Sequence, residues 1–577
     1  MINIFYLIKP YWKYGKLYLF GKIAVTIICA PLLALIEVTL TQAVIDAITT
    51  GKTLKETLLI AAIYQSVWLG VTLIRWVFLI LYDRWKAVDI QNKINRGIYE
   101  QAILTDYKYF DDPQFYNDYT FTVSEYAAKS TAALDLLLQV CGIVSVVIAM
   151  TTYLALLGPW VILFAVLGSA VYMFAQSIIG KLGIARTKES VPHDRKLSYI
   201  HRVSYLKQYA ADLKTSLLNK TILKEFDKSG GEKVGVFKKY AVPNTWANIL
   251  FFAAYFLFDL VILLYLIVSA FTKELSVGAI TGLFTAAKRL HGQLTQFVEL
   301  FGKALELSLY AEKVREFFNL KSKIETQVTG AEPSNGSFAL ELKNVSFTYP
   351  KSDFSLRNIN ISVASNEKIA IIGENGAGKT TLSKLLLRLY DVDSGDILYN
   401  GKSIREYDIH KLRLKIGVAF QEPQIYGLTV RKNMEVYNTA EDSALREVLE
   451  KVGLNIELDD EVTREFDENG VMLSGGQSQK LALARLLYGE FGLLLLDEPS
   501  SALDPLAEYK MTKLIFEQSK TTTIMVAHRL STIRDADCIY LIDSGGIAEK
   551  GTHSELMNMH GKYFEMFTKQ AENYTKE

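Results

Sequence analysis

A glycine-rich stretch, IAIIGENGAGKTT, has the residue types and spacing of a loop that holds phosphate groups. Gly373, Gly378, Lys379 and Thr380 match the pattern G-x-x-x-x-G-K-[ST], between a β-type run and an amphipathic helix. Backbone N–H groups of such a loop surround phosphate oxygens, and the helix N-terminus adds the positive end of its dipole. Lys379 would reach the terminal phosphates, and the Thr380 hydroxyl would bind Mg²⁺. A chance glycine turn is the alternative, but the strand-to-helix context favours a nucleoside triphosphate site.

An acidic pair follows four consecutive leucines in the stretch LLLLDEP. Asp497 would hold Mg²⁺, directly or through water. Glu498 is placed to polarise a water molecule aimed at the terminal phosphate. The alternative is an acidic strand-to-loop turn without chemistry, and the phosphate loop in the same region argues against it. The two clusters together predict hydrolysis of a nucleoside triphosphate.

Further motifs of the same region resemble those of ATP-binding cassette proteins. LSGGQ at Leu473–Gln477 resembles the family signature, and Tyr349 in SFTYP resembles the aromatic residue that stacks on adenine. Gln421 in AFQEP resembles the glutamine of the Q-loop. SALD, which ends at Asp504, resembles the D-loop, and His528 in VAHRLST resembles the switch histidine that contacts the γ-phosphate. Because all of these motifs occur in the family's order, the resemblance is specific.

The resemblance implies that ATP and Mg²⁺ are cofactors and that this region is an ATP hydrolase. By resemblance, Mg²⁺ would be held by Thr380, Gln421 and Asp497, and catalysis would fall to Glu498 and His528. The residues implied to bind ATP are Tyr349, Glu374, Asn375, Gly376, Ala377, Gly378, Lys379, Thr380, Thr381, Gln421 and Asp497.

In the family, two chains pair and bind two ATP molecules between facing cassettes, so that the partner's LSGGQ completes each phosphate loop. Every motif position here has a residue compatible with hydrolysis, whereas family heterodimers often have one defective site. The resemblance therefore favours a homodimer, in which a second copy of this chain is the partner. The contacts made to ATP in trans would come from Ser474, Gly475, Gly476, Gln477 and Asp504.

Short β-type runs alternate with amphipathic helices in 338–577, and these elements would position the motifs. We expect an α/β P-loop NTPase domain with a largely parallel, buried sheet, preceded by a linker at 320–337 where Pro, Gly, Asn and Ser cluster. The strands of that sheet are expected within 339–349, 367–373, 491–498, 521–528 and 538–543.

Residues 1–319 contain long apolar runs, each close to the ~20 residues that a helix needs to cross a bilayer. Lys and Arg cluster in two long polar connections, 83–133 and 182–245, which places these connections, both termini and the ATPase domain in the cytoplasm. We expect a polytopic α-helical domain in the cell (inner, cytoplasmic) membrane. Six spans ahead of one cassette resembles a half-size exporter, and the spans are expected at about 19–44, 57–82, 134–156, 159–181, 246–270 and 276–298.

Composition excludes several other classes. The 577 residues are 50% hydrophobic with a net charge of +1, so we expect membrane lipid and no nucleic acid among the partners. The three cysteines lie far apart and match no zinc or CxxC spacing, which argues against structural disulfides and metal sites.

Exporters of the family have short helices at the cytosolic ends of the long connections, and these helices dock on the cassettes. The stretches 106–118 and 208–216 are the candidates here, with Phe110, Phe115 and Tyr116 as side chains that would enter a cassette groove. An ordinary amphipathic cytosolic helix is the alternative for each.

The sixth expected span is unusual because Lys288 and Arg289 would lie near the bilayer midplane. A charge there costs at least ~2.5–3.5 kcal/mol unless it faces protein or water. The polar residues form one helical stripe, and an apolar stripe lies beside it. The polar stripe is Arg289, Gln293, Gln296, Glu299, Lys303 and Glu306, and the apolar one is Leu290, Leu294, Phe297, Phe301 and Leu305.

We expect the polar stripe to line a central cavity, where it contacts a polar or anionic part of a substrate. A pair between Asp259 and either Lys288 or Arg289, acting as an intramembrane lock, is the alternative. Lys303 and Glu306 are explained by a solvated cytosolic extension. The candidate substrate residues are Arg289, Gln293, Gln296, Lys288 and Glu37.

ATP-driven export by alternating access is the function that the resemblance implies, and a mixed-charge cavity suits a zwitterionic chain. A peptide, such as a bacteriocin, toxin or signalling peptide, is therefore the first substrate class. Multidrug efflux and the flipping of a lipid or lipid-linked sugar are the alternatives. An ATP-gated channel or regulator belongs to a different class, and an intact Glu498 argues against it.

Overall fold

The computed structural model describes residues 3–273, 275–327, 329–350, 354–464, 466–499, 505–518, 521–527 and 529–575. It divides into two compact units. Unit 1 comprises Met1–Ala102 and Asn117–Leu320, and unit 2 comprises Ile103–Tyr116 and Lys321–Glu577. A short segment from the helical half of the chain, Ile103–Tyr116, therefore clusters with the second unit.

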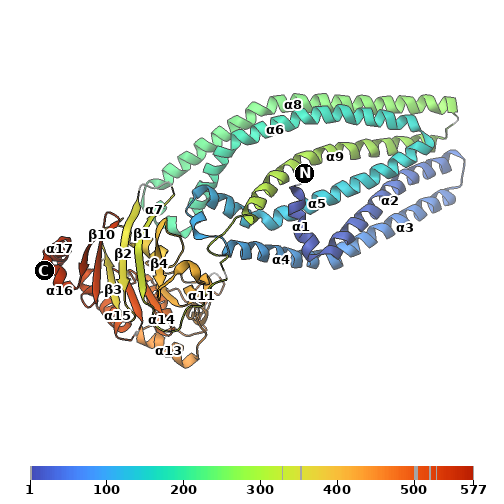
Figure 1. The fold of residues 1–577 in the computed structure, drawn as a ribbon. Helices are drawn as coiled ribbons and strands as arrows, with labels where there is room; N and C mark the ends of the chain where they lie inside the picture. The colour runs from blue at the N-terminus through green and yellow to red at the C-terminus, as the bar shows by residue number, and fades with distance from the viewer. Residues whose placement is uncertain are drawn as a thin grey trace. The chain divides into compact units, whose positions relative to one another are not determined.

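Unit 1 is built from helices, most of them long (Figure 1). A π-helical turn, Phe78–Asp83, joins α3 to α4 without a break in the helical path. Helices α6 and α8 lie side by side over much of their length. The helices are α1 (Ile4–Tyr14), α2 (Lys16–Thr49), α3 (Leu54–Val77), α4 (Arg84–Ile103), α5 (Pro113–Leu157), α6 (Pro159–Tyr205), α7 (Lys207–Thr215), α8 (Leu218–Lys273) and α9 (Val277–Phe318).

Local chemistry explains where these helices begin. The Thr53 side chain accepts a hydrogen bond from the Glu56 N–H, and the Glu56 carboxylate accepts one from the Thr53 N–H, which caps α3. The Ser276 hydroxyl accepts from the Ala279 N–H at 3.0 Å and caps α9. Pro159 stands at the first position of α6, where its missing N–H costs nothing.

Five helical stretches of the described residues are long and apolar enough to cross a membrane. They contain the first five predicted spans. The sixth predicted span, 276–298, is the first half of α9, which does not qualify because Lys288, Arg289, His291 and Gln293 lower its hydropathy. A count of six spans therefore stays a prediction. The five stretches are Lys16–Thr49, Leu54–Ile103, Thr122–Leu157, Pro159–Tyr205 and Leu218–Thr272.

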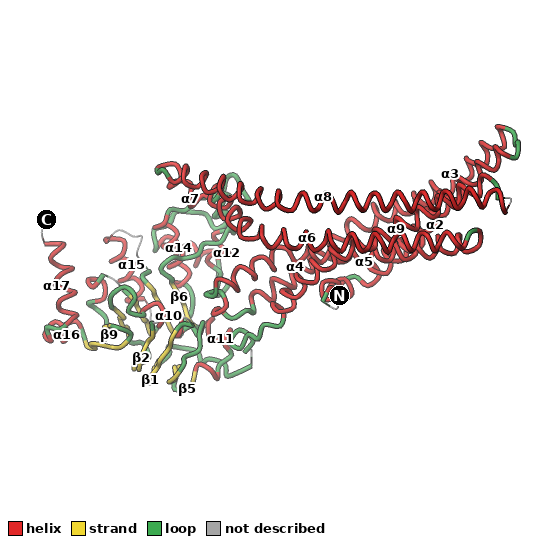
Figure 2. The backbone as a smooth tube through the Cα atoms, turned by 90° about the horizontal axis from the view of Figure 1, so that it is seen from above, coloured by secondary structure: helices red, strands yellow, loops and turns green. Residues whose placement is uncertain are grey.

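Helix α9 nevertheless packs inside the bundle. Leu283, Ala286 and Ala287 are fully buried, in one cluster with Ala34 and Val38 of α2. Small side chains at such a contact let two helix backbones approach closely, as in membrane helix pairs. The backbone tube in Figure 2 follows α9 lengthwise along α2 and α6. The α9 segment is thus held by close packing rather than by its own hydropathy.

Unit 2 contains a six-stranded sheet of order β10-β9-β3-β8-β7-β6, in which only the β9–β10 pair is antiparallel. This sheet confirms four of the predicted strands. Its strands are β3 (Lys368–Ile372), β6 (Ile416–Ala419), β7 (Leu493–Asp497), β8 (Thr522–Val526), β9 (Cys538–Asp543) and β10 (Gly546–Gly551).

The fifth predicted strand lies in a different sheet. β1 (Leu340–Thr348) is a strand of a four-stranded antiparallel sheet of order β2-β1-β4-β5, so its expected place in the parallel sheet was wrong. The physical reason is visible in its alternating burial, which is typical of an antiparallel strand with one face in the core. The other strands of this sheet are β2 (Ser355–Val363), β4 (Ser394–Tyr399) and β5 (Lys402–Ser403).

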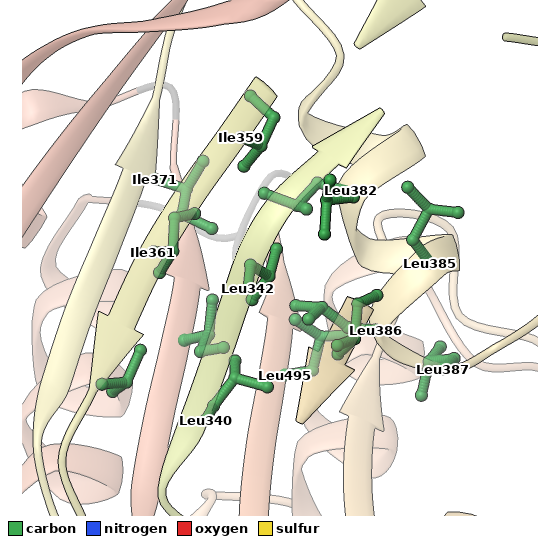
Figure 3. Packing of buried hydrophobic residues seen from close by; sticks show 14 of the residues in the cluster. Leu340, Leu342, Ile359, Ile361, Ile371, Leu382, Leu385, Leu386, Leu387 and Leu495 are labelled. Atoms are coloured by element: carbon green, nitrogen blue, oxygen red, sulfur yellow. The ribbon is translucent and has the colours of Figure 1, made fainter. Parts of the chain in front are cut away.

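Buried side chains between the two sheets hold the helix that follows the phosphate loop. Figure 3 shows Leu340 and Leu342 of β1 with Ile371 of β3, beside Leu382 and Leu386 of α10. This core fixes the first turn of α10 against the end of β3. The helices of unit 2 are α10 (Lys379–Leu386), α11 (Ile409–Leu414), α12 (Val430–Met434), α13 (Asp442–Lys451), α14 (Gly475–Leu487), α15 (Pro505–Gln518), α16 (His553–Met559) and α17 (Lys562–Thr575).

Candidate functional site

The predicted phosphate loop joins β3 to α10. Gly378 caps α10 with a left-handed φ of 108°, and a Cβ there would lie 2.5 Å from Leu356 Cδ2. Glycine is thus required at this position by both backbone and space. Glu374, Asn375, Gly376 and Thr380 are exposed on the loop. Ala377 and Thr381 are buried, so they would contribute backbone groups rather than side chains.

The Lys379 ammonium lies within the curve of the loop. Its Nζ donates to the carbonyl oxygens of Gly373 at 2.9 Å and Glu374 at 3.1 Å. Burial lowers the pKa of this ammonium, and the Glu498 and Asp497 carboxylates oppose that shift. The Lys379 ammonium is a buried cation that is held by neutral carbonyls and faces two carboxylates. A bound phosphate anion would stabilise its charge through a charge-assisted hydrogen bond.

Asp497 ends β7, next to the phosphate loop, and is almost completely buried. Burial and the neighbouring Glu498 carboxylate raise the pKa of Asp497 to about 6, while Lys379 and the Thr380 hydroxyl oppose the rise. Its Oδ1 atom is buried and accepts no hydrogen bond from any described residue. A buried carboxylate oxygen without a donor is well suited to a cation.

These residues fit Mg²⁺. The orphaned Asp497 Oδ1 and the neighbouring Thr380 hydroxyl are hard oxygen ligands on one side of the loop, and Mg²⁺ prefers few protein oxygens plus phosphate and water. Bound there, the ion would neutralise phosphate charge. Gln421 lies on the exposed side of the same site, and its role as a third ligand is part of the proposal below.

Glu498 follows Asp497 in a left-handed conformation with φ of 49°, which is rare for a residue with a side chain. Its backbone N–H donates to the Val526 carbonyl at 3.0 Å, so the end of β8 holds this turn in place. Gln421 Nε2 donates to Glu498 Oε2 at 2.9 Å. The turn thus directs Glu498 away from the buried strand and toward the side of the sheet where Gln421 lies.

The signature motif forms the N-terminus of α14. The Ser474 hydroxyl accepts from the Gln477 N–H at 3.3 Å, and the Ser474 N–H donates to Gln477 Oε1 at 2.9 Å. Ser474, Gly475 and Gln477 are exposed, and Gly476 is half-buried. Among the described residues, the hydrogen bonds of these side chains stay within the motif. The helix end is therefore preorganised and available to an anion from outside the chain.

Tyr349 belongs to an aromatic cluster that the sequence did not predict. Its ring meets Tyr390 edge-on at 5.4 Å between centroids, and Tyr390 meets Tyr107 in the same way at 5.8 Å. Lys384 of α10 places its ammonium 5.0–5.9 Å from all three ring centroids. One cation–π centre therefore joins the predicted adenine-stacking residue to the segment Ile103–Tyr116.

That segment is fastened to unit 2 by a buried carboxylate. Asp106 is fully buried and accepts hydrogen bonds from the backbone N–H groups of Lys323 at 2.9 Å, and of Ile324 and Glu325 at 3.1 Å each. Its own N–H donates to Ser322 Oγ at 3.1 Å. Glu325 in turn pairs with Arg413 at 2.8 Å. We call Asp106 with Ser322–Glu325 the linker clasp, because it ties the first long connection to the predicted linker.

The predicted docking helix at 106–118 has a different form. Tyr107–Tyr109 is a 3₁₀ turn and α5 begins at Pro113, because Asp106 caps the linker rather than a helix of its own. Tyr107 makes a ring contact with Tyr390, and the Tyr390 hydroxyl donates to the Asp111 carboxylate. Phe115 packs its ring against Tyr109 and Phe110. The second candidate, 208–216, does form the separate helix α7.

Two predicted site residues, Asp504 and His528, lie outside the described residues. Lys562 of α17 is a residue that the motifs did not reveal, and its Nζ lies 3.3 Å from Glu374 and 3.0 Å from Asp543. No spacing in the sequence connects α17 to the phosphate loop, since 188 positions separate Lys562 from Glu374. The ion pair holds the exposed tip of the loop.

The candidate substrate residues lie on the exposed face of α9 and on α2. Arg289 Nη1 lies 3.8 Å from Glu37 Oε2, and both side chains are about half exposed. Lys288 Nζ lies 3.8 Å from Asp259 Oδ2 of α8. Gln293 is half-buried and Gln296 is exposed. Both contacts are long for ion pairs and lack hydrogen-bond geometry, so the charges are close but loosely held.

The two-faced helix that the sequence predicted is present only in part. Leu290 is buried beside Leu283 and Ala287, and the charged face is exposed, as expected. Phe301 and Leu305 are each about half exposed, although they belong to the predicted apolar stripe. The reason is that the tight contact with α2 uses the smaller residues at the other end of α9.

Comparison with known proteins gives the family and the fold. Residues 356–501 match the family model described as ABC transporter. The subtilin transport ATP-binding protein SpaT of Bacillus subtilis is 28% identical over 578 aligned residues, which cover 96% of this chain and 92% of SpaT. The ATP-dependent lipid A-core flippase of Salmonella paratyphi A is 40% identical over 237 residues.

The flippase match is shorter, since it covers 39% of this chain and about two fifths of the flippase. Among solved structures, a bacterial Atm1-family ABC exporter with ATP bound superposes with a TM-score of 0.79. The superposition covers 96% of this chain and 98% of that exporter, at 21% identity, and shows a common fold.

Proposed function

The chain belongs to the ATP-binding cassette transporters, and on that premise we propose that it exports a peptide across the cytoplasmic membrane. It is a multi-pass membrane protein with an ATP-hydrolysing cassette that drives transport. The observation that carries the peptide proposal is the match to SpaT, which extends over 96% of this chain and so includes the membrane helices. Substrate choice resides in those helices, whereas the flippase match is too short to include both halves of this chain.

The α9 face supports the same substrate class. Arg289 with Glu37, and Lys288 with Asp259, place both signs of charge on neighbouring helices. Pairs at 3.8 Å with about half-exposed cations can exchange partners with a zwitterionic chain at little cost, because neither cation is locked by a hydrogen bond. Gln293 and Gln296 add groups that both donate and accept. Arg289, Gln293, Gln296, Lys288 and Glu37 are therefore the proposed substrate contacts.

The proposed ATPase cycle uses the residues of the cassette site. Lys379 and the loop N–H groups bind the phosphates, Tyr349 stacks on adenine, and Mg²⁺ is held by Thr380, Asp497 and Gln421. Glu498 takes the proton from the attacking water, and His528 contacts the γ-phosphate. Ser474–Gln477 and Asp504 act on the ATP of a second copy of the chain, with both cassettes and both termini in the cytoplasm. Closure of that sandwich favours one arrangement of the helices and hydrolysis favours the other.

Mass spectrometry tests the substrate class. Culture medium and membrane lipids would be compared between cells with the wild-type chain and cells with Glu498→Gln. A peptide found in the medium only with the wild type supports the proposal. A lipid retained in the inner leaflet with Glu498→Gln would replace peptide export with flipping. No difference in either fraction would contradict export of both classes.

The substrate face is tested by Arg289→Ala and Gln293→Ala in the same assay. Each variant is expected to lower the exported amount at least about tenfold, since each removes a proposed polar contact to the substrate. Lys303→Ala is the matched control, because Lys303 is exposed further along α9. If export is unchanged in both variants, the α9 face does not contact the substrate, and the proposal of peptide export is unaffected.

A further inference from the structure

Helices α1, α5 and α9 enclose an apolar cavity that the transport cycle does not use. Its volume is about 240 Å³, and every residue that lines it is apolar. Ile4 and Ile8 come from α1, Leu137 from α5, and Phe297, Phe301 and Ala304 from α9. A peptide backbone has no partner in such a cavity, whereas a hydrocarbon chain needs none.

The cavity opens toward the outside of unit 1. Phe5 and Phe301 both line it, and their side chains are 67% and 49% exposed. Large apolar side chains so exposed on a membrane-spanning unit face lipid rather than water. The mouth is therefore apolar and open to the outside of unit 1, so an acyl chain can enter it.

Three exposed lysines have no carboxylate partner among the described residues: two of them belong to α1, and the third is the first residue of α2. Lys9, Lys13 and Lys16 are exposed, and no ion pair joins any of them to a carboxylate within the described ranges. Each ammonium instead lies near an aromatic ring, 5.5 Å from the centroid of Tyr6, 4.9 Å from Tyr14 and 5.5 Å from Trp12. α1 itself contains no acidic residue.

Other lysines near this patch do form ion pairs with carboxylates. Lys22 pairs with Asp83 at 2.8 Å, and Lys86 pairs with Asp89 at 2.6 Å. The first three lysines thus form an uncompensated positive patch, which we call the α1 lysine patch. Lys9 and Lys13 also line a second cavity of about 250 Å³ together with Gly97 and Glu100 of α4, and the Glu100 carboxylate pairs with Arg96 rather than with either lysine.

Exposed aromatic residues place this patch at the membrane surface. Trp12 is 52% exposed, and its ring meets Phe20 edge-on at 5.6 Å between centroids. Trp beside Lys on a short amphipathic helix is the composition of a segment that lies at the headgroup level. The apolar cavity is then on the acyl side of α1, and the lysine patch is on the headgroup side.

We propose that α1, α5 and α9 form a binding site for an anionic phospholipid. Its phosphate lies among Lys9, Lys13 and Lys16, and one acyl chain enters the apolar cavity. The ligand must contain both an anionic group and a hydrocarbon chain. The reason is that α1 contributes to the lysine patch, which attracts an anion, and also to the apolar cavity, which accepts a hydrocarbon. A zwitterionic phospholipid would satisfy the cavity but would place its own cation among the lysines.

Lipid bound at this site could influence the cassette through α5 and α9. α5 begins at Pro113, within the segment Ile103–Tyr116, and α9 ends at Phe318, four positions before Ser322 of the linker clasp. The proposed acyl chain contacts both helices. The lipid would therefore restrain the two helices whose ends lead to unit 2, and ATP turnover should respond to it.

Native mass spectrometry of the full-length chain tests the site. The protein would be exposed to equal amounts of phosphatidylglycerol and phosphatidylcholine in detergent. The wild type is expected to retain phosphatidylglycerol preferentially. Lys9→Ala/Lys13→Ala/Lys16→Ala should bind it about 10- to 100-fold more weakly, from the usual contribution of a lysine near an anionic surface. ATP turnover of the wild type should change with phosphatidylglycerol and that of the triple variant should not.

Three further variants distinguish a specific lipid site from misfolding and from a general effect of charge. Lys9→Arg/Lys13→Arg/Lys16→Arg should retain the lipid, which excludes misfolding as the cause of loss. Lys207→Ala/Lys214→Ala/Lys220→Ala removes the same charge from exposed positions near α7, and equal loss there would overturn a specific site. Ala304→Trp fills the cavity with the lysines intact. Undiminished retention in that variant, or equal retention of phosphatidylcholine by the wild type, would also overturn the proposal.

Discussion

At the residue scale, Glu498 combines a strained backbone with a partly exposed side chain. A left-handed backbone at a residue with a side chain costs of order 1 kcal/mol, and the bond from its N–H to Val526 keeps it there. The neighbouring Asp497 stays buried, so two adjacent carboxylates have different surroundings. That difference assigns them different tasks, with Asp497 suited to a metal ion and Glu498 to a water molecule.

Glu498→Gln should therefore lower ATP turnover by at least about 100-fold, the usual contribution of a general base. The amide can still accept the hydrogen bond from Gln421, so ATP binding should persist. Phosphate release by the full-length chain in nanodiscs and binding of a fluorescent ATP analogue are the two measurements. Glu490→Gln, at an exposed position before β7, should leave both unchanged. Turnover within tenfold of the wild type would contradict the assignment.

Asp497 makes stability depend on pH. Its pKa in the folded chain is about 6, above the ordinary 3.8, so the folded chain binds the proton more tightly than the unfolded chain. Asp497 thus costs stability above pH 6, by up to about 3 kcal/mol, and the cost disappears as pH falls toward 4. Asp497→Asn should raise the unfolding temperature at pH 7.5 without Mg²⁺, and the gain should shrink at pH 5.

Thermal unfolding of the full chain with and without Mg²⁺–ATP measures this effect. Asp543→Asn is the control with the opposite sign, since the Lys562 ammonium holds the pKa of Asp543 below its ordinary value. Asp543→Asn should therefore give no gain at pH 7.5. Mg²⁺–ATP should stabilise the wild type and not Asp497→Asn. An equal gain for Asp497→Asn at both pH values would rule out titration of Asp497 as its cause.

At the element scale, the linker clasp shows how a short segment is held without regular structure. One carboxylate satisfies three successive backbone N–H groups, as a helix cap does, and the linker follows its path because of them. Arg413 then fixes Glu325 from the cassette side. The linker 321–337 is in this way tied to the first long connection.

Asp106→Asn should destabilise the clasp by about 1–3 kcal/mol, because the amide N–H₂ replaces an acceptor in a fully buried site. A lower unfolding temperature and faster limited proteolysis within 321–337 are the expected results. Lys108→Ala is the matched control, since the Lys108 ammonium lies 3.7 Å from Asp106 and is 40% exposed. Equal effects of the two substitutions would mean that the ion pair, not the backbone bonds, holds the segment.

The sequence predicted those elements whose signal is local. The phosphate loop with Gly378 and Lys379 lies directly between β3 and α10, and the leucines before Asp497 form β7 themselves. Their spacing in the sequence was therefore enough to predict these elements. Asp106 lies more than 210 positions from the linker it binds, and Lys384 joins the rings of Tyr107 and Tyr349, which come from distant segments of the chain. Sequence periodicity does not predict contacts between residues so far apart in the chain.

Two errors have the same origin. β1 was expected in the parallel sheet because its apolar residues suit either sheet, and only its partners, β2 and β4, decide which. The docking segment was expected to be a helix because exporters of the family have a short helix at this place, whereas Asp106 uses its carboxylate on the linker. In both places the observed structure depends on partners that lie far away in the sequence.

At the scale of the whole molecule, the proposed function requires two chains to complete each ATP site. The hydrogen bonds of the signature side chains at the start of α14 remain within the motif among the described residues, so the anion that this helix end would bind comes from elsewhere. A second copy would supply it, since each chain has one phosphate loop and one signature. A closed pair with twofold symmetry then has two equivalent ATP sites.

Complementation between two inactive variants separates a shared site from a site within one chain. Lys379→Ala breaks the phosphate loop and Ser474→Arg blocks the signature, so either variant alone should lose ATP turnover in both sites of a pair. Coexpression of the two chains with different tags places an intact loop opposite an intact signature in every mixed pair. Random mixing should then restore up to about a quarter of wild-type turnover, because half of the pairs are mixed and each has one intact site. No recovery in purified mixed pairs would show that each chain completes its own site, and the homodimer proposal would fail with it.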